Sequence, residues 1–136
     1  MDCIFCKIIK GEIDSAKVYE DQDVIVILDI YPLTKGHCLV IPKNHFDNIF
    51  DVKENILQKI ILAAKKISEK IKKSLNVDGI NLLQSTGSTA GQAIFHFHLH
   101  IIPRYKGDGL VNHFGKKPQR ADIEEIKRLA EKIKLT

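Results

Sequence analysis

The stretch His96-Phe97-His98-Leu99-His100-Ile101-Ile102 alternates histidine with apolar residues. Because successive side chains point to opposite faces of a β-strand, this pattern puts the three imidazoles on one face. The odd-numbered residues 95–101 are all apolar and fall on the other face. We therefore predict a strand over 94–102, ended by Pro103, with its apolar face in the core and its histidine face toward a ligand.

The residues around this strand predict an α+β domain. Apolar residues recur every three or four positions over 53–75, which indicates one long helix. Short apolar runs bounded by Gly, Pro and polar residues indicate strands. The predicted strands cover 16–19, 24–30, 38–41, 79–83 and 94–102, and the predicted helices cover 3–10, 53–75 and 121–135. This order favours an antiparallel sheet with one long helix and a C-terminal helix.

The composition indicates a single globular domain over residues 1–136. The chain is 44% hydrophobic with a net charge of +4, which is too mild to indicate a nucleic-acid partner. No apolar run approaches the ~20 residues of a membrane span, and the N-terminus lacks the pattern of a signal peptide. Three cysteines cannot all pair in disulfides, so we expect free thiols or a metal site and a cytoplasmic location. We expect no membrane partner.

Three histidines on one strand face could bind a metal or act on a substrate. The backbones of His96 and His100 are about 13 Å apart at ~3.3 Å per residue. Zinc–nitrogen bonds of ~2.0–2.1 Å make one ion shared by both end rings unfavourable. Nucleophilic attack by a central imidazole, with neighbours that fix its tautomer, fits the spacing better.

The histidine strand resembles the His-φ-His-φ-His-φ-φ motif of the histidine triad (HIT) superfamily of nucleotide hydrolases and transferases. Other blocks resemble the family in the same order: Asp29-Ile30-Tyr31-Pro32, Lys35-Gly36-His37-Cys38-Leu39-Val40-Ile41-Pro42-Lys43, Ala90-Gly91-Gln92 and Ile101-Ile102-Pro103-Arg104. The resemblance implies a HIT fold with a motif-bearing core over about 3–109, followed by a tail and helix over 110–136.

The resemblance also implies a mechanism. His98 would attack an α-phosphorus and form a nucleotidyl-histidine that water then hydrolyses. His100 would face the phosphate oxygens or the bridging atom, and His37 would lie behind the triad and orient it. A neutral imidazole suits this role because it is both a nucleophile and a leaving group.

Nucleotide-binding residues follow from the same resemblance. Asp29 would accept hydrogen bonds from the ribose. In the loop 85–92, Ser85, Gly91 and Gln92 would bind phosphate, and small residues there allow close approach of backbone N–H groups. The base would lie among five apolar residues, for which core packing is an equal alternative: Ile4, Phe5, Ile8, Ile27 and Ile30. Ser85 stands where the family usually has Asn or Gln, and Ala93 stands where some phosphoramidases have Ser, so the substrate stays open.

The N-terminal Cys3-Ile4-Phe5-Cys6 has the C-x-x-C spacing with which two thiolates hold one zinc. His45 and His96 complete the pattern of several zinc-containing HIT members. The resemblance therefore implies a closed structural zinc site of Cys3, Cys6, His45 and His96. The alternative is a pair of buried thiols with a surface histidine.

The implied function is hydrolysis of purine-nucleoside phosphoramidates or related nucleotidyl substrates by a homodimer. One alternative is a dinucleoside polyphosphate hydrolase or nucleotidyl transferase that uses the same His98. Another is a non-catalytic AMP-binding interaction protein. His113 and the run 116–120 are expected to be a solvated tail, although in the family such segments can reach a neighbouring subunit's site.

Overall fold

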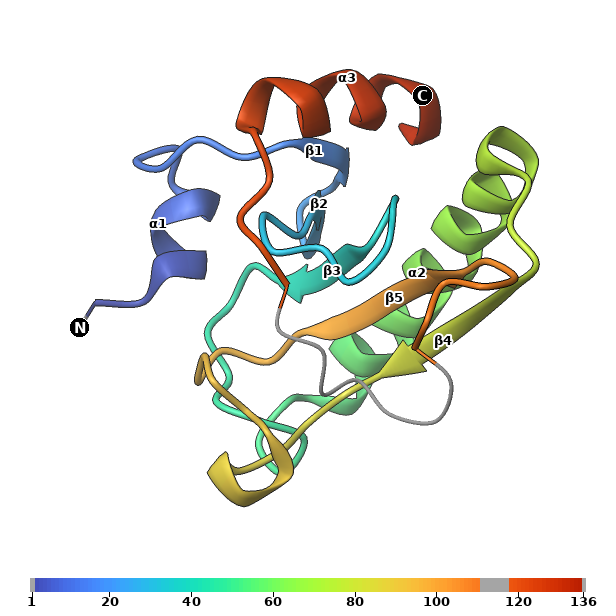
Figure 1. Cartoon of the computed structure of the whole chain (residues 1–136). Coiled ribbons are helices and arrows are strands. Elements are labelled where there is room, and N and C mark those ends of the chain that lie inside the picture. The colour runs from blue at the N-terminus through green and yellow to red at the C-terminus, as the bar shows by residue number, and fades with distance from the viewer. Residues whose placement is uncertain (1, 111–117, 136) are drawn as a thin grey trace.

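A five-stranded antiparallel sheet forms the centre of the molecule (Figure 1). The computed structural model describes residues 2–110 and 118–135. In chain order the elements are α1 (Ile4–Ile9), β1 (Lys17–Glu20), β2 (Val24–Leu28), β3 (Cys38–Pro42), α2 (Glu54–Leu75), β4 (Gly79–Leu83), the short 3-10 helix η1 (Ser88–Ala90), β5 (Leu99–Arg104) and α3 (Ile123–Ile133). The strand order is β1-β2-β3-β5-β4, and all neighbouring pairs are antiparallel. The predicted α+β class, long helix and C-terminal helix are confirmed.

The core lies on both faces of the sheet, which explains why β2 is apolar at every position. Val24, Val26 and Leu28 pack in the larger cluster, together with the buried residues of α2 and α3. Ile25 and Ile27 point the other way and pack with Phe5 of α1 in a second cluster. The helices α2 and α3 therefore cover one face, while α1 lies against the other (Figure 1).

The helix α2 has the amphipathic pattern expected from the sequence. Its buried residues recur at helical spacing: Ile56, Ile60, Ala63, Ala64, Ile67 and Ile71. The C-terminal capping residue after Leu75 is Asn76, which adopts the left-handed conformation with φ 52°, as Asn does more readily than most residues. No helix within residues 2–110 and 118–135 is long and apolar enough to cross a membrane.

The histidine strand is shorter than predicted and is shifted along the chain. We predicted 94–102, whereas β5 covers Leu99–Arg104. Its pairing with β3 begins at Leu99, opposite Val40. Before that point, the N–H of Phe97 donates to the backbone oxygen of Phe46 at 2.6 Å, outside the sheet. His96 and His98 therefore lie in the irregular segment that precedes the strand, where residues 94–96 form a bend.

Two further details of this prediction were wrong. Pro103 lies inside β5, opposite Ile80 of β4, and does not end the strand. Since the pairing with β3 stops at Ile101, Pro103 has a neighbouring strand on one side only, where proline is tolerated. Phe95, expected in the core, is 45% exposed, whereas Phe97 and Ile101 pack beneath α2 as predicted.

Candidate active site and metal centre

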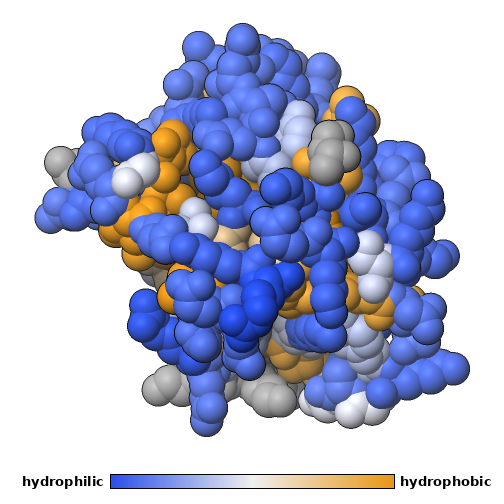
Figure 2. Space-filling view, turned by 90° about the horizontal axis from the view of Figure 1, so that it is seen from above, coloured by the Kyte–Doolittle hydropathy of each residue, from blue (hydrophilic) through white to orange (hydrophobic). Residues whose placement is uncertain are grey.

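A cavity of about 590 Å³ opens on the side of the sheet that carries α1. This size is typical of pockets that take a small organic ligand. Figure 2 shows apolar atoms gathered on the α1 side of the molecule and bordered by hydrophilic surface. The structure brings most of the predicted site residues to this cavity: Ile4, Phe5, Ile8, Ile27, Asp29, Ile30, His37, Ser85, Gly91, His98 and His100.

His98 is held in one tautomer. Its Nδ1 atom lies 2.8 Å from the backbone oxygen of His96. Because a carbonyl oxygen can only accept, Nδ1 carries the hydrogen and Nε2 keeps its lone pair. Burial lowers the pKa of His98, so the ring is neutral at pH 7. The side chain therefore offers an uncharged nucleophilic nitrogen in a cavity wall.

The rings around His98 restrict its orientation. The Phe5 ring meets it edge-on at a centroid distance of 5.1 Å, and the His100 ring does so at 5.0 Å. Phe5 also contacts the His96 ring, at 5.8 Å. An aromatic side chain from α1 thus fixes the position of the candidate nucleophile.

His37 and His100 form a chain of directed hydrogen bonds. The Leu33 N–H donates to Nδ1 of His37 at 3.0 Å, so the hydrogen of His37 is on Nε2. That Nε2–H donates to Nδ1 of His100 at 2.9 Å. The remaining nitrogen of His100, Nε2, must then carry a hydrogen, which makes it a donor for an oxygen or bridging atom of a ligand.

The electrostatics of this pair favour neutral rings. Burial, with a contribution from His98, lowers the pKa of His37 to about 4. Burial also lowers the pKa of His100 to about 3.

Gly36, just before His37, has φ +92°, and a Cβ there would lie 2.8 Å from the Leu75 side chain. Only glycine fits this turn, which sets the position of His37.

Asp29 lies at the end of β2, beside His37. One carboxylate oxygen accepts from the Tyr31 N–H at 2.9 Å, and the other lies 3.6 Å from Nε2 of His37. The side chain is only 17% exposed. Burial raises the pKa of Asp29 to about 6, because an ionised carboxylate loses solvation there.

The loop 85–92 supplies the opposite wall, but not all of its predicted ligands reach the cavity. Ser85 and Gly91 line it, and a Cβ on Gly91 would lie 3.9 Å from the Ser85 hydroxyl. Gln92, predicted to bind the nucleotide, is 5% exposed, and its side chain is engaged within the protein. It accepts from the Gly87 N–H and donates to the backbone oxygens of Asp47 and Ile94. The structure therefore gives Gln92 a supporting position behind the loop.

Cys3, Cys6, His45 and His96 converge as the sequence predicts, with their potential ligand atoms all within 4.8 Å of one another. The Nδ1 atom of His96 is 3.3 Å from the Cys3 sulfur and 3.5 Å from the Cys6 sulfur. The Nδ1 atom of His45 is 3.4 Å from the Cys6 sulfur. A tetrahedral zinc with bonds of ~2.3 Å to sulfur and ~2.0 Å to nitrogen separates these atoms by about 3.5 Å. The spacing fits zinc.

The outer hydrogen bonds of both histidines also fit a metal. His96 is fully buried, and its Nε2 lies 2.8 Å from the backbone oxygen of Pro42. The Nε2 atom of His45 lies 2.9 Å from Oδ1 of Asp47. Since both acceptors require a hydrogen on Nε2, each Nδ1 keeps a lone pair directed at the cysteine sulfurs. This is the arrangement in which partners around a metal site fix the ligand tautomer.

Several cavity residues were not identified from the sequence. Ile94 follows the loop and lines the cavity, as do Pro118 and Arg120 just before α3. The N–H of Ala121 donates to the backbone oxygen of Ile30 at 2.7 Å, which brings this segment to the cavity. We expected 116–120 to be a solvated tail. His113 and residues 116–117 lie outside the described residues.

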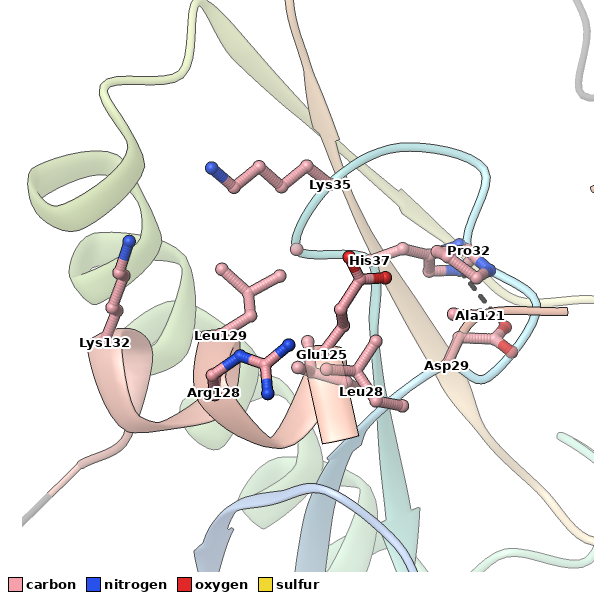
Figure 3. A pocket seen from close by; sticks show the side chains of 12 residues that line it. Leu28, Asp29, Pro32, Lys35, His37, Ala121, Glu125, Arg128, Leu129 and Lys132 are labelled. Carbon is pink, nitrogen blue, oxygen red and sulfur yellow. Dashed lines mark ion pairs between the residues drawn. The ribbon is translucent and has the colours of Figure 1, made fainter. Parts of the chain in front are cut away.

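A second cavity, of about 470 Å³, lies on the other side of Asp29 and His37, which line both cavities. Figure 3 shows Lys35 of the β2–β3 connection and Arg128 and Lys132 of α3 around it. Its wall also includes Leu28 and Leu129.

Comparison with known proteins identifies the class to which this geometry belongs. The HIT domain family matches residues 10–107, a span that holds β1 to β5 and the three histidines. The chain therefore belongs to the HIT domain family. The resemblance seen in the sequence is thereby confirmed. The HIT superfamily consists of nucleotide hydrolases and transferases.

Three relatives are similar over most of this chain, and two of them have names that state an activity. The chain is 36% identical over 136 residues to the adenosine 5'-monophosphoramidase HNT1 of Candida albicans, covering 97% of this chain and 89% of that protein. It is 44% identical over 109 residues to the adenylylsulfatase HINT3 of Arabidopsis thaliana, covering 80% of this chain and 55% of that protein. Protein hit of Bacillus subtilis is 50% identical over 109 residues, covering 79% and 75%.

A solved structure bears on the metal centre. The zinc-bound histidine triad family protein of Mycobacterium smegmatis superposes with a TM-score of 0.80 and 36% identity, covering 96% of this chain and 93% of that one. That relative binds zinc, and this chain gathers a set of donors suited to zinc.

Proposed function

We propose that the protein hydrolyses purine-nucleoside phosphoramidates or related nucleotidyl substrates through a covalent nucleotidyl-His98. The observation that carries this proposal is the 2.8 Å contact between Nδ1 of His98 and the backbone oxygen of His96. It leaves Nε2 unprotonated in the wall of a ligand-sized cavity. The adenylyl compounds in the names of two relatives support the nucleotide class.

The reaction takes two displacements at phosphorus. Nε2 of His98 attacks the α-phosphorus, and the bond from phosphorus to the leaving nitrogen or oxygen breaks. The leaving amine takes its proton from solvent. Water then attacks the same phosphorus, the phosphorus–His98 bond breaks, and the proton of that water returns to solvent. The net change is the addition of one water across the cleaved bond.

The surrounding residues have separate parts in this scheme. The Nε2–H of His100 donates to a phosphate oxygen or to the bridging atom, where charge develops. The backbone oxygen of His96 faces the Nδ1–H and stabilises the cationic phosphorylated imidazole. His37 keeps His100 in the donating tautomer through the 2.9 Å hydrogen bond.

Binding of the nucleotide would use the two ends of the cavity. The apolar residues of α1 and β2 contact the base, and Asp29 accepts hydrogen bonds from the ribose hydroxyls. At the phosphate end, the Ser85 hydroxyl and the Gly91 backbone line the wall. Ala93 also lines the cavity there.

A panel of substrates tests the proposal. Purified protein is assayed with AMP amides, diadenosine polyphosphates, adenylyl sulfate and ADP. We expect the amides to be hydrolysed with AMP as product. Preferred cleavage of the polyphosphates would favour the anhydride hydrolase alternative. Adenylyl sulfate is in the panel because one relative is an adenylylsulfatase. Tight AMP binding without any turnover would identify a nucleotide-binding interaction protein.

We propose further that Cys3, Cys6, His45 and His96 hold one structural zinc. The donor spacing and the zinc-bound relative support this proposal. Zinc would cross-link α1 to the segments that carry His45 and His96, and four protein ligands leave no coordination position for substrate. Metal analysis of the purified protein tests it directly.

The predicted assembly and location also stand as proposals. We propose one domain over residues 1–136 and a homodimer in which two sheets join. The strand β4 supports the dimer because it is an edge of the sheet and its Leu82 is 45% exposed. A cytoplasmic location agrees with three free cysteines, two of them candidate metal donors. Light scattering and cell fractionation test these two proposals.

A further inference from the structure

Gln92 occupies a position that the proposed chemistry does not use. It is buried, and its amide makes three hydrogen bonds to backbone atoms of three segments. Its Oε1 accepts from the Gly87 N–H at 2.8 Å, which closes the loop 85–92 on itself. Its Nε2 donates to the backbone oxygens of Asp47 at 2.6 Å and Ile94 at 3.1 Å. One side chain thus fixes the shape of the loop and attaches it to the segment 45–47.

Asp47 is the next member of this chain of contacts. Its backbone oxygen receives the Gln92 amide, while its Oδ1 lies 2.9 Å from Nε2 of His45. On the far side of that ring, Nδ1 lies 3.4 Å from the Cys6 sulfur. The metal donors are therefore connected to the loop through His45, Asp47 and Gln92 without a gap.

A second contact between the same two segments makes the connection stiffer. The N–H of Ile49 donates to the Thr86 hydroxyl at 3.2 Å. The loop is thus held at Thr86 and at Gln92, on both sides of η1. Gly91, between η1 and Gln92, lines the nucleotide cavity next to Ser85. A displacement of Asp47 would therefore move the part of the loop that faces the ligand.

We propose that Gln92 is a positioning residue that links the loop 85–92 to the Cys3, Cys6, His45 and His96 centre through Asp47, so that metal binding and phosphate binding strengthen each other. The inference rests on the proposed nucleotide function and on zinc at this centre. It adds a coupling between the two sites that runs through named atoms. Because coupling free energies are reciprocal, zinc must tighten phosphate binding by the same factor by which phosphate tightens zinc binding.

A comparison of adenosine with AMP isolates the contribution of the phosphate to the coupling. Both carry the base and ribose, so any effect common to the two reports on α1 and Asp29. The difference between them reports on the loop 85–92. The holoprotein is equilibrated with a zinc chelator alone, with saturating adenosine and with saturating AMP, and the retained zinc is measured. Protein-free AMP is the blank for zinc bound by the nucleotide itself.

We expect AMP to raise the apparent zinc affinity of the parent about tenfold more than adenosine does, which corresponds to about 1.4 kcal/mol of coupling. In Gln92→Met the side chain keeps its length but loses all three hydrogen bonds, so the difference between AMP and adenosine should vanish. Gln58→Met, the same substitution on an exposed position of α2, should behave like the parent. Calorimetry should show adenosine affinity within twofold of the parent in both variants.

Asp47→Ala interrupts the same chain of hydrogen bonds at another residue. It is the second test variant in case Gln92→Met folds poorly. It leaves the backbone oxygen that receives Gln92 in place but removes the carboxylate partner of His45. We expect weaker zinc retention, by about 10- to 100-fold as for other partners of metal ligands, and no extra effect of AMP over adenosine.

The outcomes distinguish this inference from the proposed function. A parent that binds AMP and zinc with no difference between AMP and adenosine overturns the coupling, as does an undiminished difference in Gln92→Met. A parent that retains zinc but binds no AMP overturns the nucleotide function and, with it, this inference. A parent that binds AMP but no zinc overturns the metal centre and the coupling while leaving the nucleotide function standing.

Discussion

The Nδ1 atom of His98 lies 2.8 Å from the backbone oxygen of His96, so a single carbonyl joins the candidate nucleophile to a residue of the candidate metal centre. The side chain of His96 points its own Nδ1 toward Cys3 and Cys6. Metal binding by His96 would therefore hold the carbonyl that fixes the His98 tautomer. In this account the zinc acts through backbone geometry and not at the reacting atoms.

Replacing a metal ligand should affect stability more than chemistry. Cys6→Ser should lower the zinc content from one ion per chain toward zero and lower the melting temperature, because structural zinc supplies ~10–16 kcal/mol of apparent binding energy in small domains. Cys38→Ala, at the buried cysteine outside the centre, should keep its zinc. Metal analysis and thermal unfolding test this prediction. Metal-free parent protein with the stability of the zinc-treated sample would contradict it.

Asp29→Ala should weaken nucleoside binding. Loss of a charge-assisted hydrogen bond to the ribose should cost ~1.5–3 kcal/mol in the binding free energy of AMP and of adenosine alike. Asp78→Ala, away from the cavity, is the matched control. Equal affinities of Asp29→Ala and the parent in titration calorimetry would remove Asp29 from the ribose site.

The same carboxyl should leave a signature in the pH dependence of stability. Its pKa is raised to about 6 by burial, above an unfolded value near 3.8, so its contribution to stability is full below the unfolded pKa. That contribution is lost as the pH rises through about 6. Asp29→Asn should therefore be more stable than the parent at pH 7, by up to about 3 kcal/mol, and match it near pH 3.5. Denaturant unfolding at both pH values measures the difference, and a constant difference between them would refute the prediction.

How far the sequence predicts the fold depends on whether neighbours in the chain or distant segments decide the local structure. The helix α2 could be predicted because its apolar stripe recurs within the helix itself. The strand β2 could be predicted because five consecutive apolar residues are buried on two faces. The start of β5 could not be predicted, because it depends on where the pairing between β3 and β5 begins and on the hydrogen bond from the Phe97 N–H to the backbone oxygen of Phe46.

The site shows the same division. The alternating histidines and the C-x-x-C spacing could be identified from residue types alone, whereas the addition of His45 and His96 to the two cysteines followed from the resemblance to the HIT family. Gln92 belongs to a matching motif, but only the fold shows that its amide faces Asp47 and not the cavity. Arg120 gave no signal, since its approach to the cavity depends on a backbone bond between Ala121 and Ile30.

His37 should act through the tautomer of His100. His37→Phe fills the space but removes the Nε2–H donor, so His100 is no longer held with its hydrogen on Nε2. We expect kcat to fall by roughly 10²-fold or more, the lower range for loss of a positioned proton donor, with AMP affinity within about twofold. Nitrogen NMR of the His100 ring should show a mixture of tautomers in the variant. An unchanged tautomer with reduced kcat would point to a purely structural effect.

The most direct test of the account is to trap the covalent intermediate. The parent enzyme is mixed with an AMP amide, quenched in alkali within a fraction of the turnover time and digested for mass spectrometry. The account predicts a nucleotidyl group on His98, and turnover reduced by up to about 10⁶-fold in His98→Ala, which keeps the fold and AMP binding. A nucleotide found on another residue, or turnover by His98→Ala within tenfold of the parent, would contradict it.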